Sequence, residues 1–324
     1  MNKEILGILE ANRGDFVSGE DLAGVLGVTR AAVWKAINAL RKEGHKITGA
    51  QNKGYKLENF SDVIRVKGIR ANLKPDTKIY KVLYFGTLES TNLKAKSFAL
   101  IGEAHGTLVI ANQQTKGRGR YGHSFVSPPG TGLYMSLILR PKIEISRFQF
   151  ITIAAAVAVC KAIEDLYENS QDLLKIKWVN DIFFRGKKIA GILTEAVTNF
   201  ESGEIESVVT GIGINVSTKN FPPEAGEQAG SIFEDEILFG RDQLCAKISD
   251  YILDFADDLT NPEIINYYRQ HSMLTGKKIS YVKENLKHFA TVTGIDDSGG
   301  LEILNEAGQK EILKSGEVSL IRSN

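Results

Sequence analysis

The sequence contains few cysteines and no apolar run long enough to cross a membrane. Cys160 and Cys245 are the only cysteines, and neither has a second cysteine or a histidine nearby at metal-ligand spacing. We therefore expect two buried free thiols. The most apolar stretch, residues 151–160, has about half of the ~20 residues that a membrane helix needs. Residues 1–10 show no signal-peptide pattern, so we expect a cytoplasmic protein.

Three common catalytic motifs are also missing. The Walker A loop, the G-x-S-x-G elbow and the H-E-x-x-H zinc motif do not occur, which argues against phosphate-loop, serine-hydrolase and zinc-protease chemistry. Residues 117–122, GRGRYG, match the G-x-G-x-x-G dinucleotide fingerprint, but that fingerprint must open a helix. This loop runs into residues 127–130, SPPG, which cannot continue a helix, so dinucleotide binding is not expected.

Length and composition indicate a folded protein of two or three domains. The chain has 324 residues, of which 43% are hydrophobic and 24% charged, and only 7 prolines. Its charge is uneven. Residues 1–75 hold 13 Lys or Arg against 8 Asp or Glu, whereas the remainder holds 27 against 31. A basic first quarter on a nearly neutral protein predicts a polyanion-binding module.

The N-terminal part has the pattern of a helix-turn-helix. Ser18 and Thr29 are placed to cap helices over 20–26 and 30–43, and Gly27 lies in the short turn between them. A shorter amphipathic helix precedes this pair. Two helices joined so tightly predict a helix-turn-helix unit.

The second helix of this pair presents side chains suited to phosphates and to base edges in a major groove. Residues 45–57 after it predict a β-hairpin, which would be the wing of a winged helix-turn-helix. The candidate DNA-binding residues are Thr29, Arg30, Lys35, Asn38, Arg41 and Lys53. The same fold can also serve as a protein-docking module, and the sequence does not reveal an operator.

From residue 79 onward, short β-rich runs alternate with helices, which predicts an α+β sheet domain. Long helices are expected over 148–167 and 241–259. The strand-like runs are 80–85, 107–113, 132–139, 176–179, 189–195 and 207–216. A small C-terminal β-barrel is predicted from runs at 277–282, 288–295 and 301–304.

The glycine-rich loop carries two guanidinium groups, Arg118 and Arg120, beside Lys116. Arginine matches phosphate oxygens in a bidentate manner, and glycines let the backbone approach a ligand. The loop can therefore close over a polyanion, although a solvated basic loop would have the same composition.

This loop belongs to a set of motifs: ESTN at 89–92, QQ at 113–114, GRGR at 117–120, KWVND at 177–181, KIAGIL at 188–193 and GIGIN at 211–215. With them the sequence resembles the biotin-protein ligases, and with its N-terminal module it resembles the bifunctional ligase-repressors of bacteria. The resemblance covers nearly the whole chain. It implies an α+β protein with a winged helix-turn-helix over 1–65, a class II synthetase-like ligase domain with a mixed sheet over 66–270, and an SH3-like β-barrel over 271–324.

The resemblance also implies a two-step reaction. The carboxylate of biotin attacks the α-phosphate of ATP, releases pyrophosphate and forms biotinyl-AMP, and a carrier lysine then attacks this mixed anhydride. Because two anions meet in the first step, cations must neutralise them. Lys177 is the candidate for this catalytic role, and Arg118 and Arg120 would hold the adenylate. Magnesium is expected with ATP, but the sequence assigns it no ligand.

The matching positions imply two overlapping sets of ligand contacts. Biotin is expected to contact Ser90, Thr91, Asn92, Gln114, Arg118, Gly119, Arg120, Lys177, Gly211 and Gly213. ATP and the adenylate are expected to contact Arg118, Arg120, Lys177, Asn180 and Asn215. The chain departs from the usual family pattern at Phe125, where tryptophan is common, and at Val179, where proline is common. Neither change removes a charged group, so biotin affinity is expected to change more than reaction type.

The partners implied are the biotin carboxyl carrier domain of a biotin-dependent carboxylase and operator DNA. Biotinyl-AMP would act as corepressor by favouring a homodimer that places two DNA-reading heads on a palindrome. Two alternatives remain at this point. A biotin sensor without catalysis is disfavoured by Lys177 and the two loop arginines, and a lipoate-protein ligase is disfavoured by GRGR and KW-x-ND.

Overall fold

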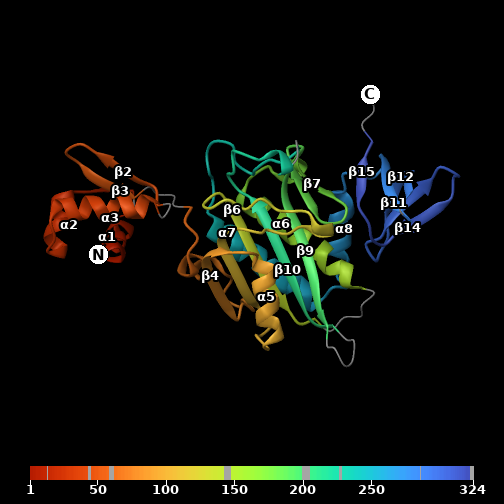
Figure 1. Ribbon diagram of the computed structural model, residues 1–324, viewed down its shortest axis with the longest axis horizontal. Coiled ribbons are helices and arrows are strands. Elements are labelled where there is room, and N and C mark those ends of the chain that lie inside the picture. The colour runs from red at the N-terminus through yellow and green to blue at the C-terminus, as the bar shows by residue number, and fades with distance from the viewer. Residues whose placement is uncertain are drawn as a thin grey trace.

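A small helical unit is followed along the chain by a large body of sheet and helices and then by a second, smaller sheet (Figure 1). The computed structural model describes residues 1–12, 14–42, 45–57, 62–141, 147–198, 205–225, 228–284 and 286–321. In Figure 1 the helical unit and the smaller sheet lie on opposite sides of the central body. Among the described helices, none is long and apolar enough to cross a membrane.

The N-terminal unit is the predicted helix-turn-helix. Its helices are α1 (Asn2–Ala11), α2 (Gly19–Leu26) and α3 (Arg30–Lys42). They enclose a core of their own, which includes Ile5, Leu9, Leu22, Val33, Ile37 and Leu40.

Both predicted N-caps of this unit are confirmed. The Asp21 N–H donates to Ser18 Oγ at 2.9 Å, and the Ala32 N–H donates to Thr29 Oγ1 at 3.2 Å. Gly27 ends α2 with a φ of 62°, the left-handed conformation that glycine adopts most easily.

The predicted wing is also present. It consists of β2 (Ile47–Ala50) and β3 (Gly54–Leu57), and the two-residue strand β1 (Phe16–Val17) pairs with β3. The sequence did not indicate β1, because two residues carry no alternation pattern. Gly54 has a φ of 99°, and a Cβ there would lie 2.1 Å from the Val17 carbonyl oxygen. The β1–β3 pairing therefore requires glycine at this position.

The central body contains the predicted mixed sheet. In spatial order its strands are β4 (Lys81–Leu88), β5 (Thr107–Gln114), β6 (Gly132–Leu139), β10 (Ile205–Asn215), β9 (Lys187–Thr198), β8 (Asp181–Phe184) and β7 (Leu174–Lys177). Only the β4–β5 pair is parallel, and the other described neighbours are antiparallel.

Helices cover both faces of this sheet, as the alternation of side chains along its strands requires. On β5, Leu108 and Ile110 face a core shared with helices α6 (Phe148–Leu166), α7 (Arg241–Asp257) and α8 (Pro262–Gln270). Val109 between them faces the opposite side, where it packs with Ala95 and Ala99 of α5 (Thr91–Leu100).

One predicted strand of the central body needs correction, and several elements were not predicted. The strand predicted over 176–179 is β7 and ends at Lys177, while Trp178 and Val179 form a buried turn into β8, which was not predicted. Helix α5 was indicated only by Ser90 and Thr91 as candidate cap residues, because its buried positions are polar or small and give no apolar periodicity. Helices α4 (Val66–Asn72) and α8 were not predicted either.

The C-terminal part is an antiparallel sheet, as expected for the small β-domain. Its strands, in spatial order, are β14 (Lys310–Leu313), β13 (Leu301–Asn305), β12 (Leu286–Ile295), β11 (Lys278–Lys283) and β15 (Val318–Leu320). Its inner face joins the main core of the central body through residues such as Ile279 and Val292. The sheet is therefore packed onto the body rather than tethered beside it.

Both cysteines are buried free thiols, as predicted. Burial raises the pKa of Cys160 and of Cys245, so neither is an available nucleophile.

The segment between the wing and the central body is fastened by a buried ion pair. Arg241 Nε lies 3.0 Å from Asp62 Oδ2, and Arg241 Nη1 donates to the Gly132 carbonyl at 2.9 Å. Burial raises the pKa of the Asp62 carboxyl, against the opposing effect of this guanidinium. Arg65 in the same segment pairs with Glu10 of α1. The helix-turn-helix and the body thus share electrostatic contacts.

The wing provides a test of this fold. Gly54→Ala is expected to destabilise the N-terminal unit by about 2–4 kcal/mol, because the new Cβ meets the backbone of β1. Gly7→Ala in α1 is the matched control, since its Cβ would meet nothing within 4 Å and alanine favours a helix. Thermal unfolding by calorimetry measures both, and equal stabilities would refute the described register of β1 and β3.

Candidate active site

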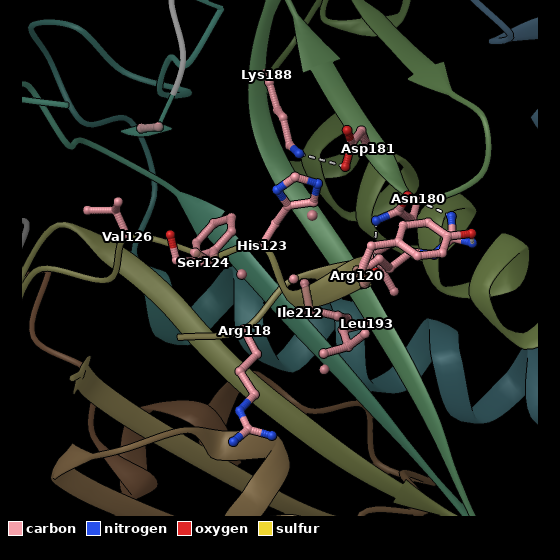
Figure 2. Close-up of a pocket in the computed structure, with 18 of the residues that line it drawn as sticks. Arg118, Arg120, His123, Ser124, Val126, Asn180, Asp181, Lys188, Leu193 and Ile212 are labelled. Carbon is pink, nitrogen blue, oxygen red and sulfur yellow. Dashed lines mark hydrogen bonds and ion pairs between the residues drawn. The ribbon is translucent and has the colours of Figure 1, made fainter. Parts of the chain in front are cut away.

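A cavity of about 510 Å³ lies where β9 and β10 meet the arginine loop, residues 117–122 (Figure 2). Its walls also include residues 316–318 from the C-terminal part. A volume of this size suits a small organic ligand or cofactor. The structure brings together in its lining all the ligand-contacting residues expected from the sequence: Ser90, Thr91, Asn92, Gln114, Arg118, Gly119, Arg120, Lys177, Asn180, Gly211, Gly213 and Asn215.

The start of α5 forms a hydrogen-bonded polar end of the cavity. Gln114 Oε1 accepts from the Thr91 N–H at 2.8 Å and from Thr91 Oγ1 at 3.1 Å, while Gln114 Nε2 donates to Ser127 Oγ at 2.9 Å. Ser136 Oγ lies within hydrogen-bond distance of Thr91 Oγ1, at 2.8 Å. Ser90 occupies the N-cap position, but its hydroxyl makes no capping bond, so helix capping does not use it.

Asn92 is held by the protein on three sides. Its Nδ2 donates to the Leu193 carbonyl at 3.0 Å and to Glu195 Oε2 at 2.9 Å, and its Oδ1 accepts from Ser136 Oγ at 2.7 Å. A Cβ at Gly211 would lie 1.8 Å from Asn92 Oδ1. Gly211 thus makes room for this asparagine.

Gly213 makes room for an aromatic wall in the same way. A Cβ at this position would lie 2.6 Å from Cε1 of Phe125, so the ring rests directly on the strand backbone. The ring also meets Tyr134 edge-on, with centroids 6.4 Å apart. Phe125 therefore keeps the aromatic surface that the family usually builds with tryptophan.

The arginine loop folds back on itself. The Gly119 N–H donates to the His123 carbonyl at 2.7 Å, and the Phe125 N–H donates to the Gly117 carbonyl at 2.9 Å. A three-residue 3₁₀ turn, Arg120–Gly122, begins at the second arginine of the loop. This confirms that the loop does not open an α-helix, as a dinucleotide fingerprint would.

The two arginines of the loop extend in different directions (Figure 2). Arg120 Nη1 donates to Asn180 Oδ1 at 3.3 Å, and its guanidinium lies 5.0 Å from the Tyr121 ring centroid. Asn180 is itself held by a 3.0 Å hydrogen bond from Nδ2 to the Ile192 carbonyl. No described residue pairs with the exposed guanidinium of Arg118, so it can bind an incoming anion.

Lysines add further positive charge to the cavity. Lys177 at the end of β7 lines it, and among the described residues its ammonium has no hydrogen-bond or ion-pair partner. Lys188 on β9 also lines it and forms a 2.7 Å ion pair with Asp181 Oδ1 (Figure 2). Lys188 belongs to the KIAGIL motif at 188–193, but the sequence did not indicate a role for this lysine.

A contact between the arginine loop and the C-terminal part was also missed. His123 Nε2 lies 3.5 Å from Glu317 Oε2, and both residues line the cavity. Nearly 200 residues separate them, and no local pattern links such a pair.

Asn215, expected at the adenine, braces a neighbouring loop. Its Nδ2 donates to the Gly230 carbonyl at 3.1 Å, and its own carbonyl accepts from the Ile232 N–H at 3.1 Å. The loop that carries Gln228 and Ala229 of the lining is thereby fixed against β10.

The candidate DNA-binding residues share the outer side of α3 and the wing. Arg30 and Lys35 are exposed. Arg41 is used differently, because its Nε donates to the Ile47 carbonyl at 2.8 Å and links α3 to the wing. Thr29 caps α3, Asn38 accepts a 3.3 Å hydrogen bond from Arg41, and Lys53 lies 5.9 Å from the Phe16 ring centroid.

The chain matches known families in three places. Residues 2–56 match the HTH domain, residues 84–215 the biotin/lipoate A/B protein ligase family, and residues 282–321 the biotin protein ligase C terminal domain. A biotin protein ligase from Aquifex aeolicus, solved in complex with biotin and ATP, superposes with a TM-score of 0.62 at 28% identity, over 75% of this chain and all of that one.

Full-length relatives are similar as well. The bifunctional ligase/repressor BirA of Bacillus subtilis (strain 168) is 34% identical over 321 residues, 96% of each chain. That of Escherichia coli (strain K12) is 28% identical over 95% of this chain and 94% of its own. Fold and site together are those of a biotin protein ligase joined to a helix-turn-helix. The chain belongs to the family of bifunctional ligase/repressors.

The aromatic wall can be tested at its glycine. Gly213→Ala is expected to weaken biotin binding by about tenfold or more, because the new Cβ must displace the Phe125 ring. Gly191→Ala faces the same ring at an ordinary 3.7 Å and should change affinity much less. Isothermal titration with biotin measures both, and indistinguishable affinities would show that the ring position does not matter.

Proposed function

We propose that this chain makes biotinyl-AMP from biotin and ATP and transfers the biotinyl group to a lysine of a biotin carrier domain. The observation that carries the proposal is the polarity of the cavity. Its lining combines hydroxyl and amide groups with four cationic side chains: Arg118, Arg120, Lys177 and Lys188.

The polar end suits the ureido ring of biotin, which offers two N–H donors and one carbonyl acceptor in fixed geometry. Ser90 and the Thr91–Gln114 pair provide hydroxyl and amide partners of the matching kinds. Phe125 provides an apolar face for the remainder of the bicyclic ring. A lipoyl group lacks the ureido hydrogen-bonding pattern, so this end favours biotin.

The cationic side chains of the lining suit the meeting of a carboxylate with a phosphate. A biotin carboxylate oxygen attacks the α-phosphorus, the bond to the bridging oxygen breaks, and pyrophosphate leaves with the electron pair. Lys177, which has no partner among the described residues, neutralises the two approaching anions, and Lys188 is a second lysine within the same cavity. Arg118 and Arg120 hold the phosphate of the product and limit its hydrolysis.

Magnesium enters this scheme with the nucleotide. Within the described residues no cluster of three or more His, Cys, Asp or Glu could hold a metal ion. The carboxylates in the lining are Asp181 and Glu317, and Asp181 is engaged by Lys188. This donor set fits an ion bound mainly by phosphate oxygens and water, which magnesium accepts, rather than a resident metal. Bound in this way, it would neutralise phosphate charge.

In the second step the neutral amine of the carrier lysine attacks the acyl carbon of biotinyl-AMP. The amide bond forms, the bond to the phosphate oxygen breaks, and AMP leaves. The expected carrier is the biotin carboxyl carrier domain of a biotin-dependent carboxylase. An enzyme that consumes ATP and binds DNA would act in the cytoplasm.

Regulation is proposed through the N-terminal unit. We assign residues 1–65 to DNA binding, 66–270 to catalysis and 271–324 to a C-terminal domain. The N-terminal unit has a hydrophobic core of its own, which supports a domain boundary near residue 65. Biotinyl-AMP would act as corepressor by favouring a homodimer that places two helix-turn-helix units on operator DNA.

The first experiment measures pyrophosphate release by the purified protein with ATP, magnesium and either biotin or lipoate. An added biotin carrier domain is then probed with avidin. Biotin-dependent release with labelled carrier supports the proposal. Biotin binding without release would make the chain a sensor, and release with lipoate alone would reassign the pocket.

Lys177→Ala is expected to lower the rate of pyrophosphate release by about 100-fold while the fold is retained, because one of the cations at the reacting phosphate is lost. Lys175→Ala on the same strand is the control, since this lysine does not line the cavity. Lys188→Ala is measured in parallel, and the two rates of pyrophosphate release show how much each lysine contributes to the reaction. An unchanged rate in Lys177→Ala removes Lys177 from the catalytic group.

The corepressor role predicts tighter DNA binding in the presence of biotinyl-AMP. DNA fragments selected by the protein from a random pool are titrated with and without the adenylate, while sedimentation follows the oligomeric state. An affinity gain of about tenfold or more together with dimer formation is expected. Equal DNA affinity under both conditions would contradict the role.

A further inference from the structure

The end of β7 and the turn that follows it, residues 178–180, are held by residues far away in the sequence. The Ile176 N–H donates to the His271 carbonyl at 2.7 Å, and the Ile176 carbonyl accepts from the Met273 N–H at 3.0 Å. Tyr268 Oη donates to the Val179 carbonyl at 3.1 Å. The backbone on both sides of Trp178 is thus fixed by the segment that leads into the C-terminal sheet.

Trp178 adds the most distant of these contacts. Its indole is almost completely buried, and its Nε1–H donates to the Gly299 carbonyl at 2.9 Å. Gln149 of α6 donates to the same oxygen at 3.1 Å. Gly299 lies in the turn between β12 and β13, so a tight turn of the C-terminal sheet contacts the motif that carries Lys177.

That turn is built to hold its carbonyl in place. Asp296 Oδ1 accepts three hydrogen bonds of 2.8 Å, from the N–H and the hydroxyl of Ser298 and from the Gly300 N–H. Gly299 has a φ of 85°, and a Cβ there would lie 2.0 Å from Cδ1 of Ile153. Glycine is required here, and the carboxylate of Asp296 determines the shape of the turn.

Three of the four cavity cations depend on the segment that this turn contacts. Lys177 is part of it, Asn180 holds Arg120 at 3.3 Å, and Asp181 holds Lys188 at 2.7 Å. Cations in the same cavity repel one another. Their positions must therefore be set by the backbone to which they are attached, or by the residues that bind them. A displacement of the turn at Trp178 would move all three together.

We propose that the 296–300 turn of the C-terminal sheet is a positioning element for adenylation, acting through the Trp178 N–H on the cations of the cavity. No residue of this turn lines the cavity. Its contribution is to fix the distances at which charge is neutralised in the transition state, where small misplacements cost rate rather than binding. The inference rests on the proposed assignment of these cations to the phosphate.

The test uses the full-length protein and two aspartates that are adjacent in the turn. Asp296→Ala removes the acceptor of three hydrogen bonds, and we expect kcat for biotin-dependent pyrophosphate release to fall about tenfold with KM for ATP and biotin nearly unchanged. Asp297→Ala is the matched control, because this carboxylate is exposed and binds only Arg269 among the described residues. Its kcat should stay at the parental value.

Two further variants separate positioning from general loss of structure. Asp296→Asn keeps an acceptor oxygen and should restore most of kcat, and Trp178→Phe removes the N–H and should lower kcat as Asp296→Ala does. Thermal unfolding is measured for all four proteins. The proposal is overturned if kcat is unaffected in Asp296→Ala, if KM rises while kcat holds, or if the loss persists in Asp296→Asn.

These outcomes are distinct from a failure of the proposed function. Without biotin-dependent pyrophosphate release in the parent protein, or with full activity in both Lys177→Ala and Lys188→Ala, the assignment of the cations is wrong. If either lysine variant is impaired while Asp296→Ala and Trp178→Phe are fully active, only the positioning role of the turn is wrong.

Discussion

Mutual repulsion between four cationic side chains around one cavity is the constraint on which the site depends. Among the described residues that line the cavity, only Asp181 places a carboxylate within 3 Å of a lysine of the lining, Lys188. Before an anion binds, this arrangement is costly, so the protein must hold the cations apart by other means. Arg120 is tied to Asn180 and Lys188 to Asp181, and Lys177 directly precedes the buried turn at Trp178 and Val179. The remaining positive charge favours an anionic ligand that reacts at this place.

The central sheet supplies the rigidity that such a site needs. Its two faces are both covered by helices, so its strands cannot easily shift. Glycines on β10 let Asn92 and Phe125 rest directly on the backbone, which brings the polar end and the aromatic wall to the same strand. The site is therefore built on strands, while the arginine loop and the C-terminal sheet close around it.

The two activities of the family are joined by contacts as well as by the chain. The Asp62–Arg241 pair is buried at the start of α7. Arg241 also donates to the Gly132 carbonyl. Gly132 of β6 pairs with Asn215 of β10, which lines the cavity. The Arg65–Glu10 pair reaches the first helix of the DNA-binding unit. These contacts connect the strand position beside Asn215 with the segment that leads to the helix-turn-helix.

The sequence by itself determined the helix-turn-helix with its caps, most strands of the mixed sheet and the buried thiols, because caps and alternation are local properties of the chain. Its ordered motifs, through the family resemblance, also indicated the part of the cavity lining that was expected to contact biotin and ATP. The sequence did not define α5 or β8, whose buried residues lack a clear period, nor the pairs Lys188–Asp181 and His123–Glu317. Tertiary structure alone decided that Gly213 serves Phe125 and that Trp178 binds Gly299. Such contacts join residues far apart along the chain, and only the packed fold determines which of them meet.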